Sequence, residues 1–224
     1  NSAHTNDTAA STQIRASLVN ALVAVVGKST GSDRQLTATE VNCQTQTLQA
    51  ITAAPEALST STASTAINLI SGILKSSSPI STTAQTALAQ STSSVMEALL
   101  GPVTTSTTSA GAPAAAPAAN LKAVGDNVRN IISSIATAAL NTMQPGEAPQ
   151  VLVTKQFVSE SVKVAKGAPI ISASVEIPST ALASVGGPVG LQSTSWATNL
   201  YAYTNQTICG KVVKLTIPGI EFND

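Results

Sequence analysis

The sequence predicts an α+β fold, with an N-terminal helical subdomain followed by an antiparallel, β-sandwich-like subdomain. Apolar residues recur with a helical period up to about residue 144, and with the period of a strand after it. All five aromatic residues lie after residue 156. We therefore expect a helical subdomain over 1–147 and a β subdomain over 148–224. Within the first, the Pro-, Ala- and Thr-rich stretch 102–119 has the composition of a linker.

Two helices are predicted at the start of the chain. Within 11–27, apolar residues recur at steps of four, four and three, which places them on one helix face. These residues are Ile14, Leu18, Leu22 and Val25. A second helix begins at Thr37, because Thr37 and Glu40 form the Thr-x-x-Glu pattern of a capping box, and it ends at Pro55. Its apolar face consists of Val41, Leu48 and Ile51.

Three more helices follow before residue 147. Ser59 comes after the turn at Pro55 and can cap the third helix. Ser81 or Thr82 opens the fourth, which ends near Gly101. The inward residues are Ala66, Leu69, Ile70, Ile73 and Leu74 in the third helix and Leu88, Val95 and Leu99 in the fourth. Asn120 is predicted to cap the fifth, whose inward residues are Val124, Val128, Ile131, Ile132, Ile135 and Ala139.

Four or five strands are predicted after Pro145–Gly146, where the fifth helix ends. The first is an extended run that contains Phe157, Val158, Val162 and Val164. The stretch 170–177 is predicted as one strand, with Ile171, Ala173, Val175 and Ile177 on one face. A short turn at 181–183, an extended segment at 189–203 and a strand at 211–217 complete the chain. This spacing is typical of antiparallel sheets.

Charge and hydropathy exclude two classes of partner. Eleven basic and eleven acidic residues give no net charge, and the basic residues are scattered, so we expect no nucleic-acid binding. The longest apolar run, 18–26, contains Asn20 and is far shorter than the roughly 20 residues of a membrane span. We therefore also expect no membrane contact.

No residue pattern points to catalysis, so we expect a protein that is not an enzyme and that uses no cofactor or metal. His4 is the only histidine and lies in a polar N-terminal stretch, where a solvated residue is the usual case. The carboxylates are well separated along the chain, and neither a phosphate-binding glycine loop nor a Cys-x-x-Cys motif occurs.

Two covalent features have open alternatives. Cys43 and Cys209 form one disulfide in an oxidising compartment or stay as two buried thiols. A bridge would stabilise the fold by about 4–5 kcal/mol, because it would close a long loop. Asn6 and Asn205 each begin an N-glycosylation sequon. Because about a quarter of the chain is Ser or Thr, sequons also arise by chance, so they permit an extracellular location without supporting it.

Three of the aromatic residues form a candidate partner patch: Trp196, Tyr201 and Tyr203. Aromatic side chains are common anchors of protein interfaces. The same residues can instead fill the core of the β subdomain, and typical aromatic burial favours that interpretation.

Several segments together resemble the REJ/GAIN-type extracellular regions of polycystin-1-like proteins and adhesion receptors. They are Pro-Glu-Ala-Leu-Ser at 55–59, Ser-Ala-Ser-Val-Glu-Ile-Pro at 172–178, Trp-Ala-Thr-Asn-Leu-Tyr at 196–201 and Val-Val-Lys-Leu-Thr-Ile at 212–217. Leu200 stands where that family usually has Pro. The His-Leu-Ser or His-Leu-Thr self-cleavage motif of the family does not occur in this chain. Either the sandwich is incomplete in this chain, or this member lacks cleavage.

The resemblance implies an extracellular structural or adhesion module of a cell-surface or ciliary protein. Its partners would be other extracellular domains of the same or a partner chain, and glycans. The alternative is a subunit of an extracellular filament, flagellar hair or cell-wall glycoprotein assembly, because the Ala-Pro and Ser/Thr composition of 102–119 is similar to that of matrix proteins.

Overall fold

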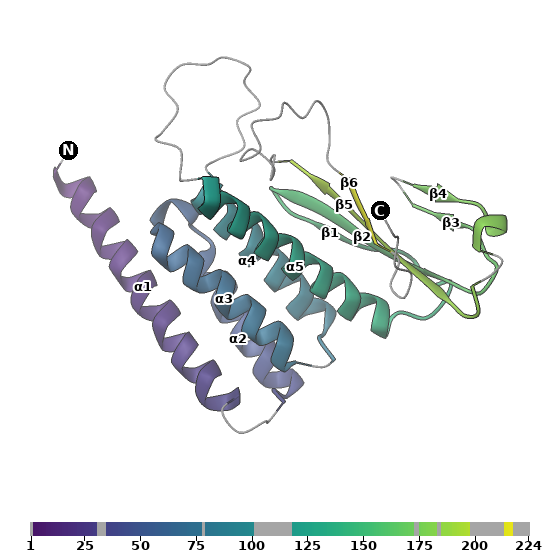
Figure 1. Cartoon of the computed structure of the whole chain (residues 1–224). Coiled ribbons are helices and arrows are strands. Elements are labelled where there is room, and N and C mark those ends of the chain that lie inside the picture. The colour runs from purple at the N-terminus through teal and green to yellow at the C-terminus, as the bar shows by residue number, and fades with distance from the viewer. Residues whose placement is uncertain are drawn as a thin grey trace, which may run out of the picture.

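The computed structural model describes residues 2–30, 35–77, 79–100, 118–172, 175–182, 185–197 and 213–216. Within these ranges, helices precede strands, which confirms the predicted α+β class (Figure 1). The helices are α1 (Ser2–Thr30), α2 (Ala38–Thr52), α3 (Thr60–Ser76), α4 (Thr82–Leu100) and α5 (Ala118–Thr142), with short 3₁₀ turns η1 (Pro55–Ala57) and η2 (Ser179–Leu182). The strands are β1 (Gln150–Val153), β2 (Phe157–Val164), β3 (Ile170–Ile171), β4 (Glu176–Ile177), β5 (Val189–Trp196) and β6 (Val213–Thr216).

Helix α1 differs from its prediction in both its start and its buried face. It begins at Ser2 rather than at residue 11. Over 9–28, where burial is described, its buried residues are Val19, Leu22 and Val26, so Leu22 alone remains of the predicted inward set Ile14, Leu18, Leu22 and Val25. The reason is that residues 18–26 are apolar almost all round the helix, so the period does not select a face. Arg15 fixes the rotation by donating a hydrogen bond to the carbonyl of Ile51 at the end of α2.

The predicted helix starts of α2, α3 and α4 are confirmed by their capping bonds. Thr37 Oγ1 accepts a hydrogen bond from the backbone N–H of Glu40 (3.3 Å), and Glu40 Oε2 accepts one from the N–H of Thr37 (2.9 Å). Ser59 Oγ accepts from the N–H of Thr62 (3.1 Å). Of the two candidates for α4, Ser81 is the cap, because its Oγ accepts from the N–H of Ala84 (3.1 Å).

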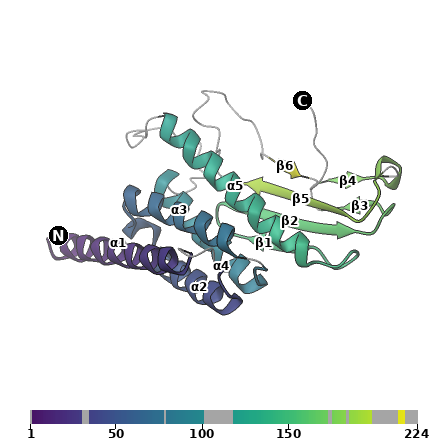
Figure 2. The same cartoon turned by 60° about the horizontal axis from the view of Figure 1, so that its bottom comes forward.

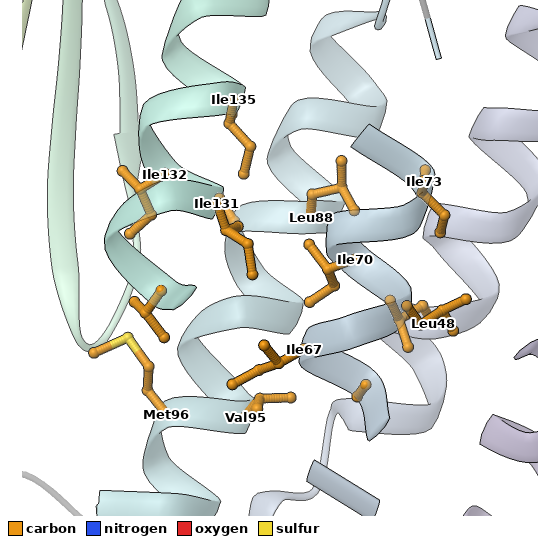
Figure 3. Packing of buried hydrophobic residues seen from close by; sticks show 14 of the residues in the cluster. Leu48, Ile67, Ile70, Ile73, Leu88, Val95, Met96, Ile131, Ile132 and Ile135 are labelled. Atoms are coloured by element: carbon orange, nitrogen blue, oxygen red, sulfur yellow. The ribbon is translucent and has the colours of Figure 1, made fainter. Parts of the chain in front are cut away.

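Helix α4 packs against α2, α3 and α5, and the core between them is aliphatic. Figure 3 shows side chains from these helices pointing toward one another. They are Ile67, Ile70 and Ile73 of α3, Leu88, Val95 and Met96 of α4, and Ile131, Ile132 and Ile135 of α5, all buried. Full burial of each such side chain stabilises the fold by roughly 1.5–3 kcal/mol before entropy is subtracted.

Helix α5 begins at Ala118, so the predicted cap at Asn120 is wrong: that residue lies within the helix. The predicted inward residues of α5 are buried, except Val124, which is half-buried. Of the predicted linker 102–119, the part up to residue 117 lies outside the described residues, and the rest belongs to α5.

Strands β1, β2, β5 and β6 form an antiparallel sheet in that order, within the described part of the chain. Its register pairs Phe157 with Trp196 and Val164 with Val189. Helix α5 covers one face of the sheet, as Figure 2 shows, so the sheet packs on the helical bundle. The short strand β1 was not among the predicted strands, while β6 lies inside the predicted strand 211–217.

The predicted single strand 170–177 is wrong, because the chain turns back within it. β3 and β4 are two-residue strands that pair antiparallel, Ile170 with Ile177. Ser172 closes the turn: its N–H donates to the carbonyl of Val175 (3.0 Å), and its Oγ accepts from the N–H of Val175 (3.2 Å). Ile170 is therefore buried while Ile171 is 65% exposed, the reverse of the predicted face.

Candidate functional site

Trp196 is no surface anchor. Only 5% of the residue is exposed, and its ring lies 5.6 Å from the ring of Phe157, at 52° between the planes. Both rings belong to the same buried cluster as the aliphatic residues of the helices. Trp196 thus fills the core, which is the interpretation that typical aromatic burial favours. Tyr201 and Tyr203 lie outside the described residues.

Of the other predicted site residues, two lie in described elements: Cys43 in α2 and Asn6 in α1. Cys43 is exposed on α2, whereas Cys209 and Asn205 lie outside the described residues. The disulfide therefore stays a prediction. Asn6 belongs to α1, a helix rather than the surface loop that a glycosylation sequon usually occupies.

In the part of the chain that the structure describes, His, Cys, Asp and Glu side chains form no cluster that could hold a metal ion. The clearest ionic group is on α5, where Asp126 Oδ2 accepts from Lys122 Nζ (2.6 Å) and Asp126 also pairs with Arg129. The hydrogen bond from Lys122, and then that from Arg129, lower the pKa of Asp126 against an opposing desolvation effect. Pairs at these helix spacings are a common stabilising feature of helix surfaces, so we assign this group a structural role.

A buried polar layer joins the sheet to the helices, and the sequence patterns did not indicate it. Gln150 Nε2 of β1 donates to Gln85 Oε1 of α4 (2.5 Å). The N–H of Gln156 donates to Ser93 Oγ of α4 (3.2 Å). The first two bonds reach α4. A third bond reaches α5, where the carbonyl of Ile132 accepts from Gln192 Nε2 of β5 (3.3 Å). These bonds satisfy buried polar groups and fix the position of the sheet on the bundle.

The exposed side of α1 forms an apolar groove together with α2. Ile14 and Leu18 line it from α1, and Thr47, Ala50 and Ile51 line it from α2. The groove is open and has a volume of about 600 Å³. A more polar groove of about 320 Å³ lies between the end of α3 and α5, and its hydroxyl-bearing residues are Ser77, Ser133, Ser134, Thr137 and Thr142. Among the described residues, Arg15 in the first groove is the one titratable side chain that lines either groove.

Helix α1 is also the one described helix that is long and apolar enough to cross a membrane, over Ala9–Lys28. Judged by length and composition alone, the expectation that no stretch of the chain is long and apolar enough to cross a membrane is therefore wrong. In the fold, Val19, Leu22 and Val26 of this stretch pack into the bundle core, and Arg15 is bonded to α2. The absence of membrane contact stays a prediction.

No protein-family model matches this sequence, and no curated protein matches it significantly.

Proposed function

We propose that this chain is a non-enzymatic, extracellular structural or adhesion module of a polycystin-1-like cell-surface or ciliary protein. The observation that carries the proposal is a hydrophobic core that runs from the helices into the sheet. Leu152, Phe157 and Trp196 of the sheet belong to the same buried cluster as residues of all five described helices. A module built in this way transmits load between neighbouring domains without a hinge between its helical and β parts.

The arrangement of the elements also favours a connecting role. The N-terminal end of α1 and the sheet lie at opposite ends of the molecule (Figures 1 and 2). A salt bridge between Lys155 and Glu97 (2.5 Å) adds a further tie between the sheet and α4. We therefore expect the partners to be other extracellular domains of the same or a partner chain, and glycans, rather than small substrates.

Secretion from a eukaryotic cell tests the extracellular part of the proposal. We expect a folded product in which Cys43 and Cys209 resist alkylation without reductant, and which loses mass on N-glycosidase treatment. The Cys43→Ser variant is the matched control, because it leaves one cysteine that reacts. A secreted chain with two reactive thiols and no glycan would contradict an extracellular module, as would retention and degradation of a chain that folds well in the cytosol.

A second candidate function is a subunit of an extracellular filament, flagellar hair or cell-wall glycoprotein assembly. The exposed apolar side of α1 favours it, because such surfaces are common contact sites. Light scattering of the purified chain separates the two candidates: growth into open-ended particles with concentration favours the filament subunit, and a bounded size favours the module.

A further inference from the structure

Helix α1 carries an exposed apolar stripe made of Ile14, Leu18, Ala21 and Val25, here called the α1 stripe. The steps between these residues are four, three and four, which is the a/d spacing of a coiled-coil seam. Ile14, Leu18 and Val25 are 60%, 47% and 53% exposed. Helix α1 lies at the edge of the helical bundle (Figures 1 and 2), and its neighbouring face, with Val19, Leu22 and Val26 buried, packs against α2 and α3.

We propose that the α1 stripe binds the α1 stripe of a second copy of this chain, with the two helices antiparallel. The stripe is self-complementary in that arrangement. A two-fold axis between Leu18 and Ala21 places Leu18 against the partner's Ala21 and Ile14 against the partner's Val25. Each large side chain then meets a smaller one, which is the packing that lets two facing layers interdigitate.

Charge favours a second copy in the antiparallel direction. The stripe carries no ionisable side chain. The Lys and Arg residues of α1 itself are Arg15, which is bonded to the carbonyl of Ile51, and Lys28, which is exposed beyond one end of the stripe. A parallel pair would bring the two copies of Lys28 together, whereas the antiparallel pair keeps them about 25 Å apart at 1.5 Å per residue. Antiparallel helix dipoles also attract one another.

The size of the surface sets the expected strength of the pairing. Ala10, Ser17 and Ala24 flank the stripe and are small enough for two helix backbones to approach closely. Thr47 and Ala50 of α2 extend the contact on the other side, as part of the groove described above. From Ile14 to Val25 the stripe is only about 17 Å long at 1.5 Å per residue. It therefore buries less area than the standard interface of about 800 Å² per partner, and we expect a weak dimer with a micromolar dissociation constant.

Sedimentation equilibrium of the purified full chain tests the pairing. We expect the native chain to change from monomer to dimer as its concentration rises through the micromolar range, and Leu18→Glu to stay monomeric. Val23→Glu is the matched control: Val23 is an apolar residue of α1, 38% exposed, on the opposite side of the helix from the stripe. A native chain that stays monomeric up to about 0.5 mM would overturn the proposal. Dimerisation of Leu18→Glu, or its loss in Val23→Glu, would place the contact elsewhere and would overturn it too.

A charge swap tests the direction of the helices. Because Leu18 faces the partner's Ala21 in the antiparallel pair, Leu18→Glu and Ala21→Lys should each abolish the dimer, and the double variant should restore it. In a parallel pair each residue faces its own copy, so the double variant would stay monomeric, which would overturn the antiparallel arrangement.

Circular dichroism of every variant checks that α1 is folded. The test does not depend on secretion or glycosylation, so its failure is distinct from failure of the extracellular module. Assemblies larger than a dimer would overturn this closed pairing and favour the filament subunit.

Discussion

Ile170 and Ile171 are identical neighbours in the sequence with opposite environments. Ile170 is fully buried in a cluster with Val162, Leu182 and Leu191, on the face of the sheet away from α5. Ile171 points to solvent. The turn at Ser172 sets this difference, because it makes β3 end after two residues and reverses the chain. A single strand over 170–177 would have placed Ile171 inside.

Replacing each isoleucine in turn therefore distinguishes the β3–β4 hairpin from a single strand over 170–177. We expect Ile170→Ala to lower the free energy of unfolding by about 2–5 kcal/mol, because it removes buried methyl groups and leaves a cavity. Ile171→Ala, the matched control, should change it by less than about 0.5 kcal/mol, as is usual for an exposed site. Urea denaturation of the two variants measures both values. The opposite order of the two effects would contradict the β3–β4 hairpin.

The helices show which parts of the fold the sequence could predict. Caps are local, so Thr37, Ser59 and Ser81 could be placed from residue type and spacing. In α5, polar residues separate the apolar ones, so the helical period selects one face of the helix. The sequence could therefore predict the burial of Ile131 and Ile135. In α1 nearly every position from 18 to 26 is apolar, so only contact with α2 and α3 decides which side is buried.

The capping box of α2 is a feature whose contribution can be measured. We expect Thr37→Ala to destabilise the protein by about 1 kcal/mol, because the first N–H groups of α2 lose their acceptor. Thr39→Ala is the matched control, since it changes the same residue type within the first turn of α2. Thermal unfolding followed by circular dichroism compares them. Equal effects of the two substitutions would show that the cap contributes nothing specific.

At the scale of the whole molecule, the sheet presents a partly polar face to the helices. Ser159, Ser161, Gln192 and Thr194 are buried on that face, between β2, β5 and α5. The sequence could not predict this, because alternation of polar and apolar residues usually puts the polar side toward water. Hydrogen bonds such as that from Gln192 to Ile132 make the burial favourable. The candidate sites could not be predicted from the sequence for the same reason. The burial of Trp196 and the exposure of the α1 stripe are set by tertiary packing.

The central claim is that the helical and β parts form one structural unit, joined by a shared core and a polar layer. The measurement is urea unfolding of the full chain followed by two probes at once. Far-ultraviolet circular dichroism reports mainly on α1–α5, and fluorescence reports on Trp196, the only tryptophan, in β5. We predict that both probes give the same midpoint and slope, as a single cooperative transition requires. Loss of the Trp196 signal at a lower urea concentration than the helical signal would contradict the claim, because it would show that the sheet unfolds on its own.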